Sequence, residues 1–299
     1  MLARLQRLLV LGIAWAVFAW GFFWWPRSTA VALAGGALLA GGYALLLAVE
    51  FVLLGRFSRA EPGLRATGAE LLRAWWLEAG AALRVFGWRQ PFRAGAVPDE
   101  LPCASSGGPR RGVVLIHGYV CNRGLWTPWL ERLRGQGRAF VAVSLEPVFG
   151  AIDAYAPQVD DAVRRVTEAT GLPPLLVCHS MGGLVARAWL RAADDDARVH
   201  RVVTLGTPHG GTWLGRFSHA PNGRQMRLDS DWLRQLARDE TPARRARFIC
   251  WYSNCDNIVF PVLTATLPDA DNRLQRGAPH VQLAFQPAVM AAVLAELEQ

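Results

Sequence analysis

The sequence PLLVCHSMGG, Pro174–Gly183, predicts a short apolar strand, a tight turn and the start of a helix. Ser180 lies in the turn, where an elbow between strand and helix would present its hydroxyl above the edge of a sheet. The two backbones pass close together at such an elbow, so small residues are needed on both sides. Gly182 and Gly183 meet this need on the helix side, whereas Cys178 replaces the usual glycine on the strand side. The motif alone also fits an ordinary turn with an idle serine.

The composition of the 299-residue chain limits the partners that it can have. Hydrophobic residues make up 52% of the chain, and their excess lies near the N-terminus. All 32 basic residues are arginines and contribute to a net charge of +8, but they are scattered and accompany no nucleic-acid-binding motif. We therefore expect no nucleic acid partner. A basic surface close to a membrane would favour anionic headgroups.

The five cysteines are odd in number and show no spacing typical of a metal site. Cys178 belongs to an expected buried strand, and Cys250 lies in another predicted core strand. Unpaired, buried thiols are the favoured interpretation, although a disulfide between Cys250 and Cys255 is compatible with an oxidising compartment. The remaining two cysteines are Cys103 and Cys121.

The N-terminal region contains two long apolar runs separated by a short turn. Leu8–Trp25 carries no charge, and at about 1.5 Å per residue a helix of this length would extend roughly 27 Å, close to the ~30 Å of a bilayer core. Ala30–Gly55 follows and is interrupted only by Glu50. We predict a transmembrane hairpin, in which glycines of the second run would allow close helix packing. These glycines are Gly35, Gly36, Gly41 and Gly42.

A cleaved signal peptide is the alternative interpretation of the first run. Tryptophans cluster at its far end, as in an interfacial aromatic belt, no small-residue cleavage site is present there, and the second run would remain in any case. The turn of the hairpin holds only Arg27. The positive-inside tendency therefore places both chain termini in the cytoplasm. The arginines that flank the hairpin on that side are Arg4, Arg7, Arg56, Arg59 and Arg65.

An amphipathic segment and a linker follow the hairpin. Gly68–Trp88 has helical periodicity with a broad apolar face and with charged residues, Glu78 among them, away from much of it. This helix would lie either in the membrane interface or against the following domain. Pro91–Arg111 is rich in Pro, Gly and Ser, which is typical of a linker. The predicted units are a transmembrane hairpin (1–60), an amphipathic helix with linker (61–111) and a catalytic domain (112–299).

From Gly112 onward, strand-like apolar runs alternate with helical patterns. This alternation predicts an α/β domain with a mostly parallel sheet and helices on both faces. The expected strands are Val113–Ile116, Phe140–Leu145, Leu175–Val177, Val199–Leu205, Phe248–Ser253 and Val281–Phe285. The expected helices are Leu125–Leu133, Tyr155–Thr170, the segment after Ser180, Asp231–Leu236 and Pro287–Leu297.

A serine hydroxyl is a weak nucleophile at neutral pH and needs a nearby base, which in turn needs an orienting acid. In open parallel sheets such groups gather at the carboxyl ends of the strands. Asp256 follows a predicted strand, and His280 lies in the loop before the predicted final strand. The order Ser180, Asp256, His280 is that of the α/β-hydrolase triad. Asp269 and Asp271 are weaker candidates for the acid, because they lie in a polar loop and neither directly follows a strong strand.

Five short motifs together carry a family resemblance. They are HGY at 117–119, CHSMGG at 178–183, LGTPHGGT at 205–212, YSNCDNIVFP at 252–261 and APHVQL at 278–283. From Gly112 to its C-terminus the chain resembles a bacterial lipase or esterase of the α/β-hydrolase family. The resemblance implies the α/β-hydrolase fold and cleavage of carboxylic esters, often acyl lipids, without a cofactor. With the predicted hairpin, it implies an integral protein of a bacterial inner membrane whose catalytic domain faces the cytoplasm.

The resemblance also assigns roles to residues at the matching positions. Ser180 would be the nucleophile, His280 the general base and then the general acid, and Asp256 the group that orients and stabilises the imidazolium. The oxyanion hole would consist of the backbone N–H groups of Met181 and Tyr119, and one such donor is typically worth about 100- to 1000-fold in rate.

Other motif residues have simpler interpretations. Some lipases of this family bind structural calcium near the catalytic histidine, but Gln282, two positions after His280, is not an acid, so we expect no metal site. We expect His117 and His179 to support packing and hydrogen bonds, and His209 to shape its loop. Three residues after LGTPHGGT fit an acyl pocket or a lid as well as ordinary packing; they are Trp213, Leu214 and Phe217.

The sequence therefore predicts a membrane-anchored serine hydrolase that cleaves acyl esters, with lipid-like substrates favoured by the anchor. An acyltransferase or thioesterase would use the same three residues and differ only in its acceptor or leaving group. A catalytically silent membrane protein that uses the fold for binding is a third hypothesis, but it leaves the presence of all three triad positions unexplained.

Overall fold

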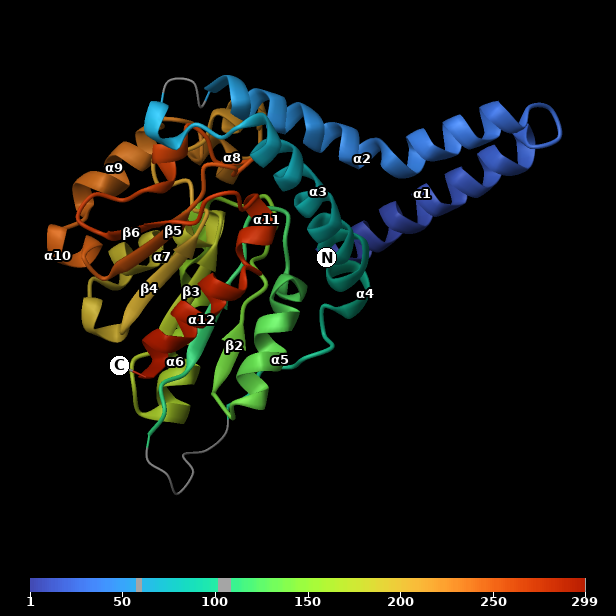
Figure 1. Ribbon diagram of the computed structural model, residues 1–299. Helices are drawn as coiled ribbons and strands as arrows, with labels where there is room; N and C mark the ends of the chain where they lie inside the picture. The colour runs from blue at the N-terminus through green and yellow to red at the C-terminus, as the bar shows by residue number, and fades with distance from the viewer. Residues whose placement is uncertain (58–60, 102–108, 299) are drawn as a thin grey trace.

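The computed structural model describes residues 1–57, 61–101 and 109–298. Its C-terminal part contains a six-stranded sheet in the order β2-β1-β3-β4-β5-β6, in which all neighbouring strands run parallel (Figure 1). The carboxyl ends of the strands therefore meet at one edge of the sheet, as the sequence predicts. The strands are β1 (Val113–Ile116), β2 (Phe140–Ala142), β3 (Leu175–His179), β4 (Arg201–Leu205), β5 (Phe248–Tyr252) and β6 (Asp271–Leu274).

Helices cover both faces of this sheet. Alternate residues of a strand point to opposite faces, so Val114 and Ile116 of β1 belong to one hydrophobic core and Val113 and Leu115 to the other. The first core includes residues of α6 and α7, and the second includes residues of α5 and α12. The helices of this part are α5 (Thr127–Gly135), α6 (Ala156–Thr170), α7 (Met181–Ala193), α8 (Pro221–Gln225), α9 (Asp231–Asp239), α10 (Pro242–Arg245), α11 (His280–Leu283) and α12 (Pro287–Ala295).

The final strand differs from the prediction. The sixth strand is Asp271–Leu274, whereas the predicted strand Val281–Phe285 overlaps the short helix α11. The sequence DNRL gives no apolar signal, because β6 is an edge strand whose side chains are exposed or half-buried. The apolar run after His280 is too short to distinguish a strand from a helix by periodicity. Consequently His280 begins a helix and does not precede a strand.

The helices α1 (Leu2–Trp24) and α2 (Thr29–Phe57) form a hairpin that projects from the sheet domain (Figure 1). Both are long and apolar enough to cross a membrane, by length and composition. The expectation of close glycine packing holds at Gly35 alone, where a Cβ would collide with the Trp20 ring. A Cβ at Gly36 would reach only ordinary contact, and Gly41 and Gly42 face open space. The hairpin interface is therefore less glycine-dependent than the sequence suggests.

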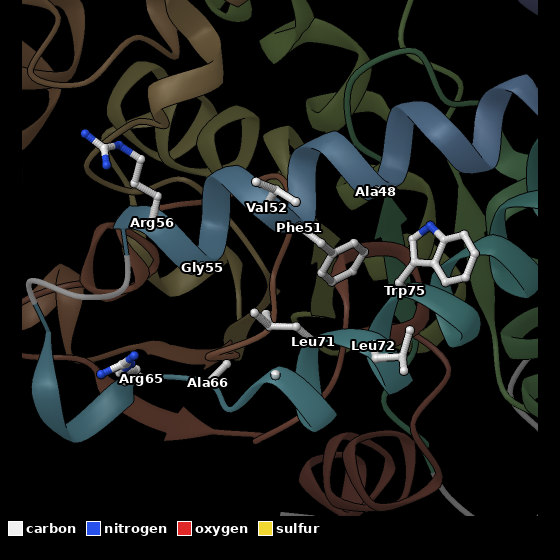
Figure 2. Close-up of a pocket in the computed structure, with 11 residues that line it drawn as sticks. Ala48, Phe51, Val52, Gly55, Arg56, Arg65, Ala66, Leu71, Leu72 and Trp75 are labelled. Carbon is white, nitrogen blue, oxygen red and sulfur yellow. The ribbon is translucent and has the colours of Figure 1, made fainter.

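The base of the hairpin packs on α3 (Gly68–Arg84), which begins with a capping box between Thr67 and Glu70. The Trp75 indole N–H donates to the carbonyl of Ala44 at 2.8 Å, and the C-terminal half of α2 buries Phe51 and Leu54. Figure 2 shows an apolar groove between these helices, with Arg56 and Arg65 at one end. The next helix, α4 (Gln90–Arg93), contacts α1.

Helix α3 also packs against α11 with a face that the sequence does not reveal. Its buried residues include Ala74, Ala81 and the charged Glu78, which is only 1% exposed. Trp76 and Leu83, which belong to its predicted apolar face, are 64% and 68% exposed. The buried face therefore consists of alanines and one glutamate, and part of the apolar surface of the helix remains exposed.

Four of the cysteines are free, buried thiols, so the disulfide between Cys250 and Cys255 is not formed. Cys103 lies outside the described residues, as does Arg59 of the predicted basic flank. The remaining free thiols are Cys121 and Cys178.

Candidate active site

Ser180 occupies the sharp turn between β3 and α7, with φ 53° and ψ −128°. A non-glycine residue rarely adopts positive φ, and such strain persists only where neighbouring contacts enforce it. The Ser180 N–H donates to the carbonyl of Leu205 at 2.9 Å, and its carbonyl accepts from the Thr207 hydroxyl at 2.8 Å. The predicted elbow is therefore present, and contacts with the end of β4 hold it in place.

Glycines on both sides allow the backbones to approach at this elbow. A Cβ at Gly182 would collide with the carbonyl oxygen of Ile116. A Cβ at Gly118 would lie 2.7 Å from the Cβ of Ser180, so the loop after β1 reaches the serine directly. Cys178, at the unusual strand-side position, is fully buried in the core.

Asp256 and His280 form a buried pair near this turn. The carboxylate Oδ2 of Asp256 lies 2.9 Å from Nδ1 of His280, and its Oδ1 accepts the N–H groups of Ile258 and Val259 at 2.9 and 2.8 Å. The backbone of Gly206 lies against the pair, because a Cβ at this position would lie 2.8 Å from Oδ2 of Asp256. The carboxylate is thus fixed by its own loop and directed at the imidazole.

The competing acids are bound elsewhere. Asp269 forms an ion pair with Arg245 at 2.7 Å, and Asp271 forms one with Arg273 at 2.5 Å. Asp256 is therefore the candidate that the structure brings to His280.

Several groups determine the protonation of His280. Burial alone would lower the pKa of its imidazole, but the charge and hydrogen bond of Asp256, together with the carboxylates of Glu78 and Glu50, raise the pKa above its ordinary value. Electrostatically, the site therefore favours an imidazolium at this position.

The segment around the serine contacts this histidine directly. The rings of His179 and His280 are 4.7 Å apart, and His179 Nε2 lies 3.1 Å from the His280 carbonyl oxygen. No hydrogen bond joins the Ser180 hydroxyl to His280 within the part of the chain that the structure describes. Such catalytic hydrogen bonds are often long without substrate and tighten when it binds.

The two predicted oxyanion donors belong to the two segments that meet at Ser180, the start of α7 and the loop after β1. Met181 is the first residue of α7, where N–H groups have no intrahelical acceptor. Tyr119 is half-buried and follows Gly118, whose backbone approaches the serine. The next residue, Val120, has φ 51°, an unusual conformation for a β-branched side chain that the sequence does not predict.

The three other histidines of the motifs, His117, His179 and His209, are buried. Burial lowers the pKa of His117 to about 4 and that of His179 to about 3, and it holds the pKa of His209 well below the ordinary value. His117 Nε2 accepts the N–H of Leu145 at 2.9 Å, and His209 Nε2 lies 3.1 Å from the Thr204 hydroxyl. These contacts agree with the structural roles expected from the sequence.

The apolar residues after LGTPHGGT are distributed between packing and exposure. The Trp213 ring packs on Phe57 of α2 at 4.8 Å and on Phe260 at 6.1 Å, with Leu214 beside this cluster. Phe217 is 64% exposed. Trp213 therefore connects the candidate active-site domain to the hairpin.

Sequence reasoning missed the glutamates that approach the site from the N-terminal segment. Glu78 accepts N–H groups of the two residues after His280, and Glu50 binds Asn257, next to Asp256. Their only sequence signal is a charge within an apolar or amphipathic run. Among the described residues, no group of three or more His, Cys, Asp or Glu side chains is arranged to hold a metal ion.

A parallel sheet whose serine elbow adjoins a buried Asp–His pair is the arrangement of α/β hydrolases. A sequence profile described as the Alpha/beta hydrolase family matches residues 113–296, more than half of the chain, so this protein belongs to that family. No sequence among the curated proteins matches the chain.

Solved structures of lipases share the fold at low sequence identity. The mature form of Bacillus licheniformis lipase BlEst2 superposes with a TM-score of 0.57 and 17% identity, over 66% of this chain and 95% of the lipase. The propeptide form of the same lipase gives a TM-score of 0.54 and 18% identity, over 66% of this chain and 52% of the other. At this identity the likeness concerns the fold.

Proposed function

We propose that this protein is a membrane-anchored serine hydrolase that cleaves carboxylic esters, with lipid acyl esters as substrates. The observation that carries the proposal is the buried Asp256–His280 hydrogen bond next to the strained elbow of Ser180. The two lipase structures that share the fold support the same reaction class.

In the proposed mechanism, His280 Nε2 removes the proton of the Ser180 hydroxyl as its oxygen attacks the ester carbonyl carbon. Asp256 holds Nδ1–H of the ring and stabilises the imidazolium that forms. The imidazolium then protonates the leaving alkoxide, and an alcohol departs from the acyl-enzyme. Water, deprotonated by His280, attacks the acyl-enzyme and releases the carboxylic acid.

The negative charge that develops on the carbonyl oxygen requires fixed donors. We assign this role to the backbone N–H groups of Met181, which directly follows Ser180, and Tyr119, which directly follows Gly118. Backbone donors are held rigidly by the elbow and by the loop after β1, so they need little reorganisation during the reaction.

The proposed membrane anchor is the hairpin of α1 and α2. Large apolar side chains are exposed along it, for example Trp15 (70%), Phe22 (79%) and Val52 (73%), and a soluble surface rarely carries so many. Trp76 and Leu83 of α3 continue this exposed apolar surface at the base. A bilayer would cover all of these side chains, which supports a lipid substrate.

The arginine distribution supports a cytoplasmic catalytic domain in a bacterial inner membrane. The chain N-terminus packs on the sheet domain, where the Met1 ammonium pairs with Glu146 at 2.7 Å, so the base of the hairpin and the domain share one side. Most arginines flank this base, and Arg27 lies at the turn.

The test is hydrolysis of p-nitrophenyl esters with short to long acyl chains by the detergent-solubilised protein and by Ser180→Ala. Loss of activity in the variant, together with a long-chain optimum in the wild-type protein, would support a lipid ester hydrolase. Loss of activity in the variant, together with a short-chain optimum in the wild-type protein, would reduce the proposal to an esterase whose anchor only localises it to the membrane. Equal hydrolysis by both proteins, or none by either, would refute it.

A further inference from the structure

Carboxylates of the N-terminal segment reach the loops that carry the proposed catalytic pair. Glu50 of α2, Glu61 before α3 and Glu78 of α3 each accept hydrogen bonds from residues between 257 and 282. This segment lies outside residues 113–296, the part of the chain that the family profile matches. The family match therefore does not by itself predict these contacts.

Glu78 binds the backbone directly after His280. Its Oε1 accepts the N–H of Val281 at 2.8 Å, and its Oε2 accepts the N–H of Gln282 at 3.1 Å. Both oxygens therefore act as acceptors, the role in which an ionised carboxylate is strongest. The side chain is 1% exposed, so water does not compete for these bonds. Glu78 thereby determines where the first turn of α11 lies.

Glu50 reaches the backbone N–H of His280 through a side-chain amide. Asn257 Nδ2 donates to Glu50 Oε2 at 2.7 Å, and Asn257 Oδ1 accepts the N–H of His280 at 3.3 Å. Asn257 is fully buried and directly follows Asp256. The chain of contacts from Glu50 therefore holds Asn257 between the two members of the proposed catalytic pair.

We propose that Glu50 and Glu78 are positioning residues for His280: together they fix three consecutive backbone N–H groups at 280–282 and surround the ring with negative charge. This inference rests on the proposed function. Hydrolysis by the triad passes through an imidazolium, so fixed negative charges beside the ring stabilise the state that forms during attack. The membrane hairpin and α3 are then parts of the active site as well as an anchor.

Glu61 provides a matched control within the same chain. It accepts the N–H groups of Val262 and Leu263 at 2.9 and 3.0 Å, so it makes the same kind of two-donor contact from the same segment. Its contacts do not involve the residues around His280. If both glutamates only held the backbone in place, neither substitution would move the acid limb of kcat/KM.

The charges predict a specific pH effect. The groups that face the His280 ring are Asp256, Glu78, Glu50 and the neutral ring of His179, and the three carboxylates raise the pKa of His280. Burial raises the pKa of Glu78 itself to about 7, so Glu78 gains its charge over the same pH range in which His280 loses its proton. His280 acts as a base only when neutral. Removing a neighbouring carboxylate lowers its pKa and moves the acid limb of kcat/KM to lower pH.

The experiment compares Glu78→Gln, Glu50→Gln and Glu61→Gln in the full chain in detergent. It measures kcat/KM for a p-nitrophenyl ester against pH and the rate of labelling by a fluorophosphonate. Glu78→Gln should lower both rates by about 10- to 100-fold, because the amide NH₂ opposes one backbone donor and displaces His280. Glu50→Gln keeps an acceptor for Asn257 and loses only charge, so it should mainly move the acid limb to lower pH.

Glu61→Gln should leave the acid limb at its wild-type position. The inference is overturned if Glu78→Gln and Glu50→Gln keep the wild-type limb, or if Glu61→Gln moves it equally. If thermal unfolding shows that Glu78→Gln does not fold, the position of the acid limb in Glu50→Gln alone tests the inference. A Ser180→Ala variant that hydrolyses esters as fast as wild type would refute the proposed function instead.

Discussion

Two carboxylates approach His280 from different regions of the molecule. Asp256 follows a strand of the sheet and bonds to the imidazole ring, whereas Glu78 comes from α3 and bonds to the backbone behind it. The first lies in a motif that the family resemblance identifies, and the second lies outside the family match. The family motifs thus contain the candidate reacting groups, while a segment outside the family match contributes to their surroundings.

The largest effect is expected when Asp256, the carboxylate that follows a strand of the sheet, is changed. Asp256→Asn should lower kcat by roughly 10⁴-fold, because an amide cannot hold Nδ1–H of His280 in the required tautomer. Steady-state hydrolysis of a p-nitrophenyl ester measures this loss. Asp271→Asn is the matched control, since Asp271 pairs with Arg273, and it should retain activity. Equal losses in the two variants would contradict the assignment of the acid.

A glycine of the serine elbow and a glycine of the hairpin should respond differently to substitution by alanine. Gly182→Ala should destabilise the protein by about 1–3 kcal/mol, because its Cβ would meet the backbone carbonyl of Ile116, which cannot move cheaply. Gly42→Ala in α2 should cost nothing and gain up to about 1 kcal/mol of helix propensity, because open space surrounds it. Thermal unfolding in detergent compares them, and a larger loss for Gly42→Ala would contradict this difference.

The smallest effect concerns pH. Because its carboxylate neighbours raise the pKa of His280, the acid limb of kcat/KM should have its midpoint above 6.5, the ordinary imidazole value. The rate rises with pH as the ring loses its proton and can act as a base. A pH series with one p-nitrophenyl ester measures the midpoint. A value at or below 6.5 would show that burial outweighs the surrounding carboxylates.

The sequence predicts the centre of the sheet well and its edge poorly. VVLI of β1 is buried on both faces and gives an unambiguous apolar run. DNRL of β6 pairs only with β5 at the edge, so its polar residues give no strand signal. The run after His280 is a short helix in place of the predicted strand, and Glu78 accepts two N–H groups of its first turn.

The candidate site shows the same division. Ser180, Asp256 and His280 could be selected from motifs, and the structure brings Asp256 to His280 by a hydrogen bond. Glu78 could not, because a charge on an amphipathic helix usually marks the solvent face, whereas here that face packs on α11. The positive φ of Val120 likewise has no signal in the sequence. The roles of the three triad candidates remain predictions that kinetics must test.

The most direct test of the account is active-site labelling. The full chain in detergent is treated with a fluorophosphonate, and the modified peptide is identified by mass spectrometry. The account predicts one adduct, on Ser180, and its loss in His280→Ala, because the hydroxyl then lacks its base. A folded wild-type protein without an adduct on Ser180 would contradict the assignment of a serine hydrolase.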